Sequence, residues 1–182
     1  MNPPDDNYRI IDLWREENVY DPRLVASVFS TSGFTRPANT TAYAAKDVMT
    51  DGVKKAMEFQ NISPIPGAAV DILNALLISS NPAATPGSFT LLLFDSPQDL
   101  ATDNTAYSPT NADMSAFLGA IYFDSYNGNA ISTAYFVSAF GHLYARLSQG
   151  STSLYGVLVS NAAYTPISNE NFHIKLFGEI VR

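Results

Sequence analysis

The chain of 182 residues contains no cysteine, which excludes disulfide bonds, thiol catalysis and thiolate metal sites together. Lysine and arginine are scarce, ten in all against 17 aspartate and glutamate residues, and the formal net charge is −7. Binding to a nucleic-acid backbone needs clustered basic residues, so we expect no nucleic-acid partner. No apolar run reaches the roughly 18 residues of a membrane-spanning helix, so we expect no membrane partner.

Charged side chains make up only 15% of the residues, below the roughly one quarter that is usual in a soluble domain. Asparagine, serine and threonine supply the polar surface in their place, and such a surface suggests burial against partner subunits. Residues 1–6 are acidic where a secretory signal would be basic and then apolar. We therefore expect synthesis in a cytoplasm, where chains without cysteine are common.

The first 22 residues differ from the rest of the chain and predict a short N-terminal arm. They hold six of the 17 acidic residues and three aromatic side chains, Tyr8, Trp14 and Tyr20. An apolar stripe at helical spacing indicates a short helix over residues 9–17, although nine residues alone form only a marginal helix. Two interpretations stay open: the arm becomes ordered against another molecule, or it folds back on its own domain.

Residues 23–182 predict an all-β domain. Alternating apolar and polar residues over 172–180 indicate a C-terminal strand, and the apolar runs at 89–94 and 157–159 are of strand length. The pattern of residues 67–80 fits a helix and a strand equally well. Further strands are expected over residues 24–30, 42–48, 53–61, 117–124 and 133–147. With turn clusters between these segments, one of them at residues 126–129, the pattern predicts an antiparallel β-sandwich with jelly-roll topology.

A search for catalytic or metal-binding motifs finds none. His142 and His173 lack a second ligand at metal spacing, so we expect both to be surface or packing residues, with no metal and no cofactor. Three acidic residues, Asp95, Asp99 and Asp103, offer oxygen ligands for calcium but lack the rest of a calcium loop. We interpret them as a solvated acidic loop. Seventeen acidic residues always allow some carboxylate pair, so glycoside hydrolysis is not excluded by composition.

The sequence becomes recognisable at residues 34–48, which read FTRPANTTAYAAKDV. This run resembles a block found in a group of structural proteins of tailed-bacteriophage virions. It is followed here, in the same order as in those proteins, by further matching stretches: 61–64 (NISP), 76–80 (LLISS), 152–159 (TSLYGVLV) and 163–166 (AYTP). The resemblance covers residues 30–182 and leaves the arm unmatched. It favours a strand over residues 67–80.

What the resemblance implies is a virion structural protein without enzymatic activity, made in the host cytoplasm and located on the capsid surface. The role that fits best is a capsid decoration or cement protein, which bridges and stabilises subunits of the phage major capsid protein. Such proteins are commonly trimers, so we expect a homotrimer that binds the major capsid protein.

Four residues are expected to contact partners: Tyr8, Trp14, Tyr20 and Arg36. Trp14 is an aromatic anchor of the kind that contributes most to binding energy. Pro37 favours extended geometry at Arg36. We expect the Arg36 side chain either to bridge to a carboxylate or a carbonyl, for example across a subunit boundary, or to lie exposed at a strand end.

Two alternative functions stay open. The first is another virion part, a tail, adaptor or head-fibre protein. The second is a carbohydrate-binding jelly-roll module, which would need exposed aromatic side chains beside acidic ones. The compact cluster of that kind is Tyr122, Asp124 and Tyr126, and a turn after a strand explains it equally well.

Overall fold

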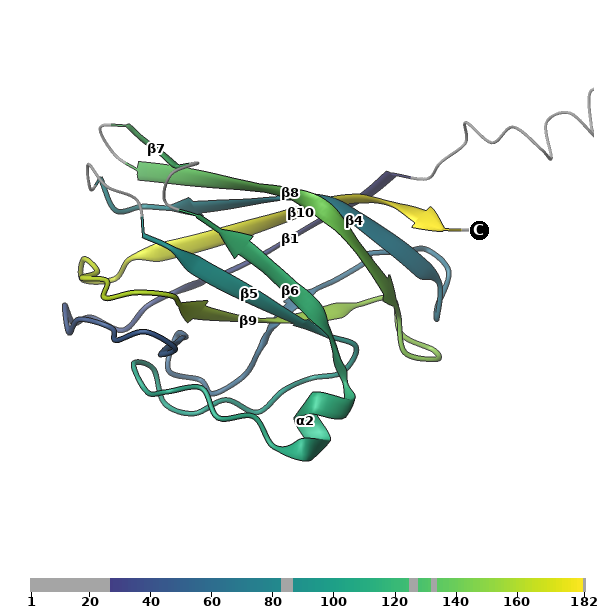
Figure 1. Ribbon diagram of the computed structural model, residues 1–182, viewed down its shortest axis with the longest axis horizontal. Coiled ribbons are helices and arrows are strands. Elements are labelled where there is room, and N and C mark those ends of the chain that lie inside the picture. The colour runs from purple at the N-terminus through teal and green to yellow at the C-terminus, as the bar shows by residue number, and fades with distance from the viewer. Residues whose placement is uncertain (1–26, 83–86, 125–127, 132–133, 182) are drawn as a thin grey trace, which may run out of the picture.

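The structure is a computed structural model that describes residues 27–82, 87–124, 128–131 and 134–181, and these residues form two antiparallel β-sheets packed face to face (Figure 1). The elements, labelled as in Figure 1, are β1 (Ser27–Thr35), β2 (Val48–Met49), β3 (Met57–Phe59), β4 (Ala69–Ser79), β5 (Phe89–Phe94), α2 (Asn111–Ser115), β6 (Phe117–Phe123), β7 (Gly128–Ile131), β8 (Ala134–Arg146), β9 (Leu154–Ser160) and β10 (Asn171–Val181).

The strand order identifies the sandwich as a jelly roll. The first sheet has the order β1-β10-β4-β8-β7, and the second has the order β2-β9-β5-β6, with β3 also paired to β9. The pairs are nested along the chain: β5 pairs with β6, β4 with β8, β2 and β3 with β9, and β1 with β10. Successive nested pairs enter alternate sheets, which is the double Greek-key arrangement of a jelly roll. The predicted β-sandwich is therefore confirmed.

Most predicted strands lie close to their expected positions. β5 has the expected bounds, and β9 and β10 contain the apolar runs found in the sequence. β6 and β8 end within one residue of the predicted segments. β1 runs from Ser27 to Thr35, five residues beyond the predicted end of its segment, and residues 24–26 lie outside the described part of the chain.

The ambiguous segment 67–80 is a strand, β4, and its ambiguity has a structural cause. The register of β4 shifts between Ile72 and Asn74 against both β8 and β10, which marks a β-bulge. Val70 and Ile72 face the core before the bulge, whereas Leu77 faces it afterwards, in the opposite phase. A strand whose inward phase changes at its centre fits neither strict alternation nor helical spacing.

Four short segments differ from the prediction. The expected strand over residues 42–48 is mainly a loop that ends in the two-residue β2, because side chains hold its backbone: Ala44 donates its N–H to the Asp47 carboxylate at 2.6 Å. The strand expected at 53–61 is reduced to β3. The turn expected at 126–129 overlaps β7, and the sequence did not predict α2, a single turn with Thr110 as its capping residue.

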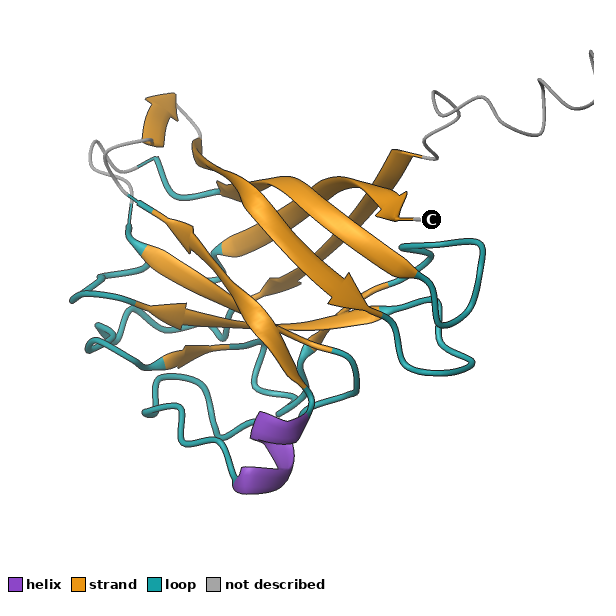
Figure 2. Ribbon diagram, turned by 45° about the vertical axis from the view of Figure 1, so that its right-hand side comes forward, coloured by secondary structure: helices purple, strands orange, loops and turns teal. Residues whose placement is uncertain are grey.

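The described residues form two apolar clusters. The larger lies between the sheets, with fully buried residues from both, among them Leu77, Phe89 and Phe172. The smaller lies on the outer side of the second sheet, where the segment 95–116, including α2, covers Phe94 and its neighbours (Figures 1 and 2). One sheet is therefore covered on both sides by the described chain.

No helix among the described residues has the length and apolar composition needed to cross a membrane.

Candidate interaction surfaces

Arg36 lies in the interior, at the point where the chain leaves β1. Its guanidinium Nη2 lies 3.1 Å from Asp103 Oδ2, and the two side chains are 0% and 5% exposed. Its Nε donates to the Tyr43 hydroxyl, and its guanidinium carbon lies 4.6 Å from the centre of the Tyr43 ring. Arg36 therefore has both an ionic and an aromatic partner within its own chain.

The Asp103 carboxylate is the centre of this cluster. Besides Arg36, it accepts the Tyr43 hydroxyl at 2.7 Å and the Thr50 backbone N–H at 3.0 Å. Burial, and then the nearby Asp103 carboxylate, raise the pKa of Tyr43 well above its ordinary value. The ion pair between Arg36 and Asp103 joins segments that lie 67 residues apart in the sequence. Asp103 does not belong to a solvated acidic loop, as the sequence suggested, because Arg36 holds it in the interior.

A second buried cluster surrounds Glu170, which is 0% exposed. Its carboxylate accepts hydrogen bonds from the hydroxyls of Ser79 and Tyr164 and from the Ile167 N–H. Asn81 Nδ2 donates to the Tyr164 hydroxyl at 2.9 Å. Burial raises the pKa of Glu170, and the hydrogen bonds to its carboxylate only partly oppose that effect.

The two clusters are connected. Arg36 donates its backbone N–H to the Glu170 carbonyl at 2.9 Å. Tyr43 and Tyr164 form an isolated antiparallel bridge, and their rings stack with centres 6.4 Å apart. One continuous buried polar network therefore ties the ends of β1, β4 and β10 to the loops that follow β1 and β9.

This network brings together sequence blocks that lie far apart in the chain. Arg36 and Tyr43 belong to the run at 34–48, Ser79 to the stretch at 76–80, and Tyr164 to the stretch at 163–166. Each contributes a side chain to the network described above. Three of the five matching stretches therefore meet in one network, at the end of the sandwich where these strands lie together.

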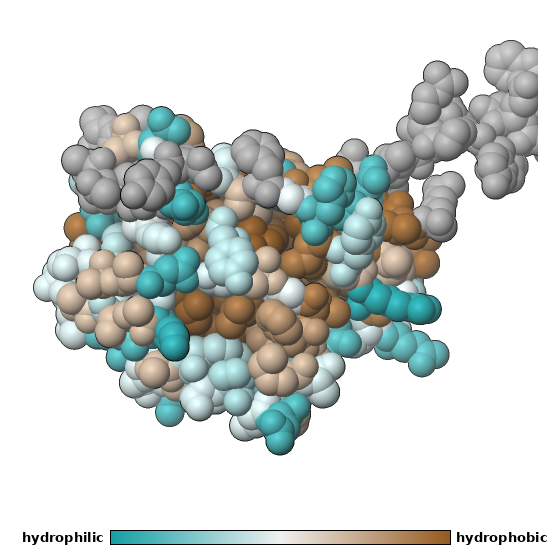
Figure 3. Space-filling view, viewed as in Figure 1, coloured by the Kyte–Doolittle hydropathy of each residue, from teal (hydrophilic) through white to brown (hydrophobic). Residues whose placement is uncertain are grey.

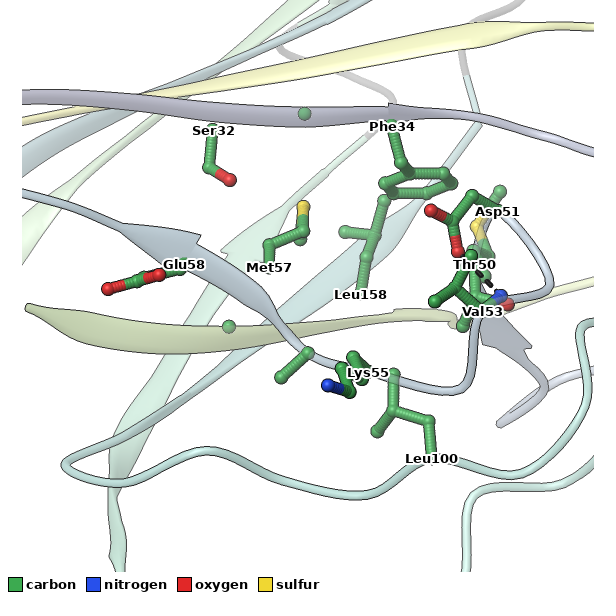
Figure 4. Close-up of a pocket in the computed structure, with 14 residues that line it drawn as sticks. Ser32, Phe34, Thr50, Asp51, Val53, Lys55, Met57, Glu58, Leu100 and Leu158 are labelled. Atoms are coloured by element: carbon green, nitrogen blue, oxygen red, sulfur yellow. Dashed lines mark hydrogen bonds between the residues drawn. The ribbon is translucent and has the colours of Figure 1, made fainter.

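A hollow of about 300 Å³ opens at the edge of the sandwich between β1 and β3. Figure 4 shows Phe34 projecting from β1 toward Leu158 and Met57, with Asp51 and Lys55 near its rim. The volume of this hollow lies at the lower end of the range for small-molecule sites. Its described lining combines apolar side chains such as Met57 and Leu158 with the charged side chains of Asp51, Lys55 and Glu58.

The opposite edge of the sandwich, between β6 and β8, is more apolar. Every residue of β6 except Phe123 is at least partly exposed, and none is charged. A smaller hollow of about 170 Å³ lies between Ile121 and Leu143. Hydrophobic residues come to the surface in the middle of this side, as Figure 3 shows. An apolar edge strand is a ready site for association with another chain.

The candidate carbohydrate cluster is only partly described. Tyr122 is 69% exposed at the edge of β6, Asp124 is exposed, and Tyr126 lies outside the described residues. His142 lies near Tyr122, and its Nδ1 is 2.8 Å from the Asp71 carboxylate. His142 thus has a hydrogen-bond partner in its own chain, and His173 is exposed on β10, where the sequence placed it.

No group of three or more His, Cys, Asp or Glu side chains within the described ranges is arranged to hold a metal ion. Of the four predicted partner contacts, Tyr8, Trp14 and Tyr20 lie outside the described residues, and their role stays a prediction. Arg36 is described and contacts Asp103, Tyr43 and Asn39 of this chain, and its contact with another subunit also stays a prediction.

Sequence reasoning missed both buried clusters. Asp103 and Glu170 carry no motif of their own, and their partners lie 67 and 91 residues away. The one available signal was the resemblance, since its separated blocks contain Arg36, Tyr43, Ser79 and Tyr164.

A scan against protein-family models and a search of curated proteins found no match to this chain. Solved structures with a similar arrangement include the vertex protein P5 of PRD1, at 13% identity and a TM-score of 0.33, covering 84% of this chain and 73% of that one. They also include the native virion of Kashmir bee virus (10% identity, TM-score 0.32, 99% and 79% covered) and murine APRIL (10%, 0.28, 81% and 98%). Because these TM-scores are below 0.5, the likenesses carry no argument about function.

Proposed function

We propose that this chain is a non-enzymatic structural protein of a tailed-bacteriophage virion, and that it acts as a decoration or cement protein on the capsid. In this role it binds the major capsid protein and bridges neighbouring subunits. No catalytic step is needed, because added contacts between subunits are enough to stabilise a shell.

The convergence of the matching sequence blocks carries this proposal. The resemblance to virion proteins rests on short stretches between residues 34 and 166, and each alone is a weak signal. Side chains from three of them meet in one buried network around Asp103 and Glu170. Blocks that build one structural unit are better support for a shared architecture than the same number of unrelated short matches.

Self-association as a homotrimer is the second part of the proposal. The chain carries a net charge of −7, so copies of it repel each other over most of their surface. The uncharged strand β6 and the apolar hollow beside it offer a surface where two copies can meet without repulsion between like charges. Light scattering on the purified chain should give a mass near three times 19.7 kDa. A mass of 19.7 kDa at all accessible concentrations would contradict the trimer.

Binding to empty heads tests the capsid role. Heads assembled from the major capsid protein of the same phage should retain this chain in a sucrose gradient, at a saturating ratio of copies to capsid subunits. Heads carrying the chain should also disrupt at a higher temperature than bare heads. Cosedimentation with purified tails and not with heads would contradict the capsid role and favour a tail or adaptor protein.

A control variant separates specific binding from aggregation. Met114 is exposed on α2, outside the strand β6 that follows it, and Met114→Glu adds one negative charge to the surface. This variant should bind heads and form trimers as the unaltered chain does. Ile121→Glu places the same charge on β6 and should give monomers.

A further inference from the structure

The outer face of the first sheet carries large apolar side chains among polar ones, and none of the described loops packs on it as the segment 95–116 packs on the second sheet. The second sheet carries a cluster of buried apolar residues on its outer side, where the segment 95–116 packs against it. This segment, with α2, lies on the side of the second sheet and away from the first sheet (Figure 2). A face of this kind normally meets another element or another molecule.

Three rows of side chains, aligned across the strands of the first sheet, define this face. Residues paired directly in an antiparallel sheet lie on the same side, so the registers fix the rows. From the β1 edge inward they read Phe29, Phe177 and Asn74; Thr31, Lys175, Leu76 and Ser138; and Gly33, His173, Ile78 and Phe136. Leu76, Ile78, Phe136 and Phe177 are half-buried, and Phe29 is 56% exposed.

Residues 1–26 are joined to the corner of this face. β1 begins at Ser27, and two residues later Phe29 already lies on the face, with its ring centre 5.4 Å from that of Phe177. Asp21 and Pro22 are turn-forming residues, which suit a reversal of the chain before β1. The rows span about 13 Å along β1, and a nine-residue helix such as that predicted for 9–17 would be about 14 Å long.

The composition of this segment complements the face. Its apolar stripe contains Trp14, the only tryptophan of the chain. It also holds six acidic residues against Arg9 and Arg15. The ionisable side chains of the three rows, Lys175 and His173, are both basic residues. The row next to Phe29 and Phe177 holds two acidic residues, Glu179 and Asp71, so the basic side chains available to the acidic segment are Lys175 and His173, farther from Ser27.

We propose that residues 1–22 bind the outer face of the first sheet of their own chain, with Trp14 as the apolar anchor and the acidic side chains around Lys175. The short connection from residue 23 to residue 26 keeps the segment at high effective concentration next to this face, which favours binding within one chain. The segment then takes the place on the first sheet that residues 95–116 take on the second. The inference does not depend on the proposed function.

Fluorescence of Trp14 tests this directly, because no other tryptophan contributes. In the folded full chain, the emission should lie at shorter wavelength, and acrylamide quenching should be several-fold weaker, than in the same chain unfolded in urea. Lys175→Glu reverses the central charge without altering the core and should shift the emission toward the unfolded value. Leu76→Glu should do the same, whereas Met114→Glu should leave emission and quenching unchanged.

Two outcomes would overturn the proposal. One is a fully quenchable, long-wavelength Trp14 in the folded full chain. The other is a short-wavelength Trp14 that neither Lys175→Glu nor Leu76→Glu affects, with both variants shown to be folded by circular dichroism. A mixing experiment separates binding within a chain from exchange between chains. The Leu76→Glu chain, mixed with an excess of Trp14→Phe chain, should keep its shifted emission, and recovery of the original emission would show binding between chains.

Discussion

Removal of the Asp103 carboxylate should be among the most destabilising single changes in this protein. Asp103→Ala leaves the Arg36 guanidinium buried without its counterion, and it removes the acceptor for the Tyr43 hydroxyl and the Thr50 N–H. Breaking a buried ion pair by deleting one partner costs about 3–5 kcal/mol. For a domain of this size, that corresponds to a fall in Tm of roughly 6–20 °C.

Urea unfolding followed by circular dichroism measures this free energy, with Asp99→Ala as the matched control. Asp99 lies in the same segment but is exposed, so its removal should change stability by less than about 0.5 kcal/mol. Replacing both partners, as in Arg36→Met with Asp103→Leu, should restore much of the lost stability, since no buried charge is then left alone. A cost of Asp103→Ala below about 1 kcal/mol, the value of a surface pair, would refute the assigned burial.

Three further changes test other parts of the structure. A Cβ at Gly178 would lie 2.1 Å from the Asp71 carbonyl oxygen, whereas a Cβ at Gly141 would meet nothing within 4 Å. In urea unfolding, Gly178→Ala should therefore lower the free energy of unfolding by about 1–3 kcal/mol, and Gly141→Ala by less than about 0.5 kcal/mol. Equal losses would contradict the β4–β10 packing. The Tyr107 hydroxyl is buried without a hydrogen-bond partner in the described structure, so Tyr107→Phe should leave stability unchanged or raise it by about 1 kcal/mol, and a clear loss would reveal a partner. Burial raises the pKa of Glu170 above its ordinary value of 4.5, so the folded chain binds this proton more tightly than the unfolded chain. The resulting stability is present below about pH 4.5 and is lost as the pH rises through the raised pKa. Glu170→Gln should abolish that part of the pH dependence of stability in urea titrations.

The sequence predicted those elements whose structure follows from local alternation. The C-terminal strand pairs with neighbours on both sides and keeps one phase over residues 172–176, so its pattern was clear. β5 is a short apolar run buried on both sides, and the flanking turn residues set its limits. In such segments burial against the neighbouring strands or sheet decides every residue, so the local pattern is enough to predict the strand.

The sequence failed where distant contacts override the local pattern. The loop between Arg36 and Asp47 contains strand-forming residues, but its backbone is fixed by Asp47 and by the Tyr43–Tyr164 bridge. α2 is one turn long and depends on its capping residue, Thr110, more than on periodicity. The bulge at the centre of β4 changes which residues point into the core, so the alternation pattern did not identify this strand of 11 residues.

The buried network was beyond prediction for the same reason. Arg36 was expected either to bridge to a carboxylate or a carbonyl or to lie exposed at a strand end; the structure shows the carboxylate bridge, to a partner that the sequence did not identify. Only the fold brings Asp103 to it from the segment that covers the second sheet. The same holds for Glu170, whose hydrogen-bond partner Ser79 comes from β4.

The composition of purified virions is the most direct test of the capsid role. Particles of the phage that encodes this chain would be purified through a density gradient, and the copies of the chain per major capsid subunit would be counted by quantitative mass spectrometry. We expect a fixed, repeated stoichiometry in heads separated from their tails. Absence of the chain from intact particles, with abundant chain in the soluble fraction of the same infected cells, would contradict a structural role in the virion.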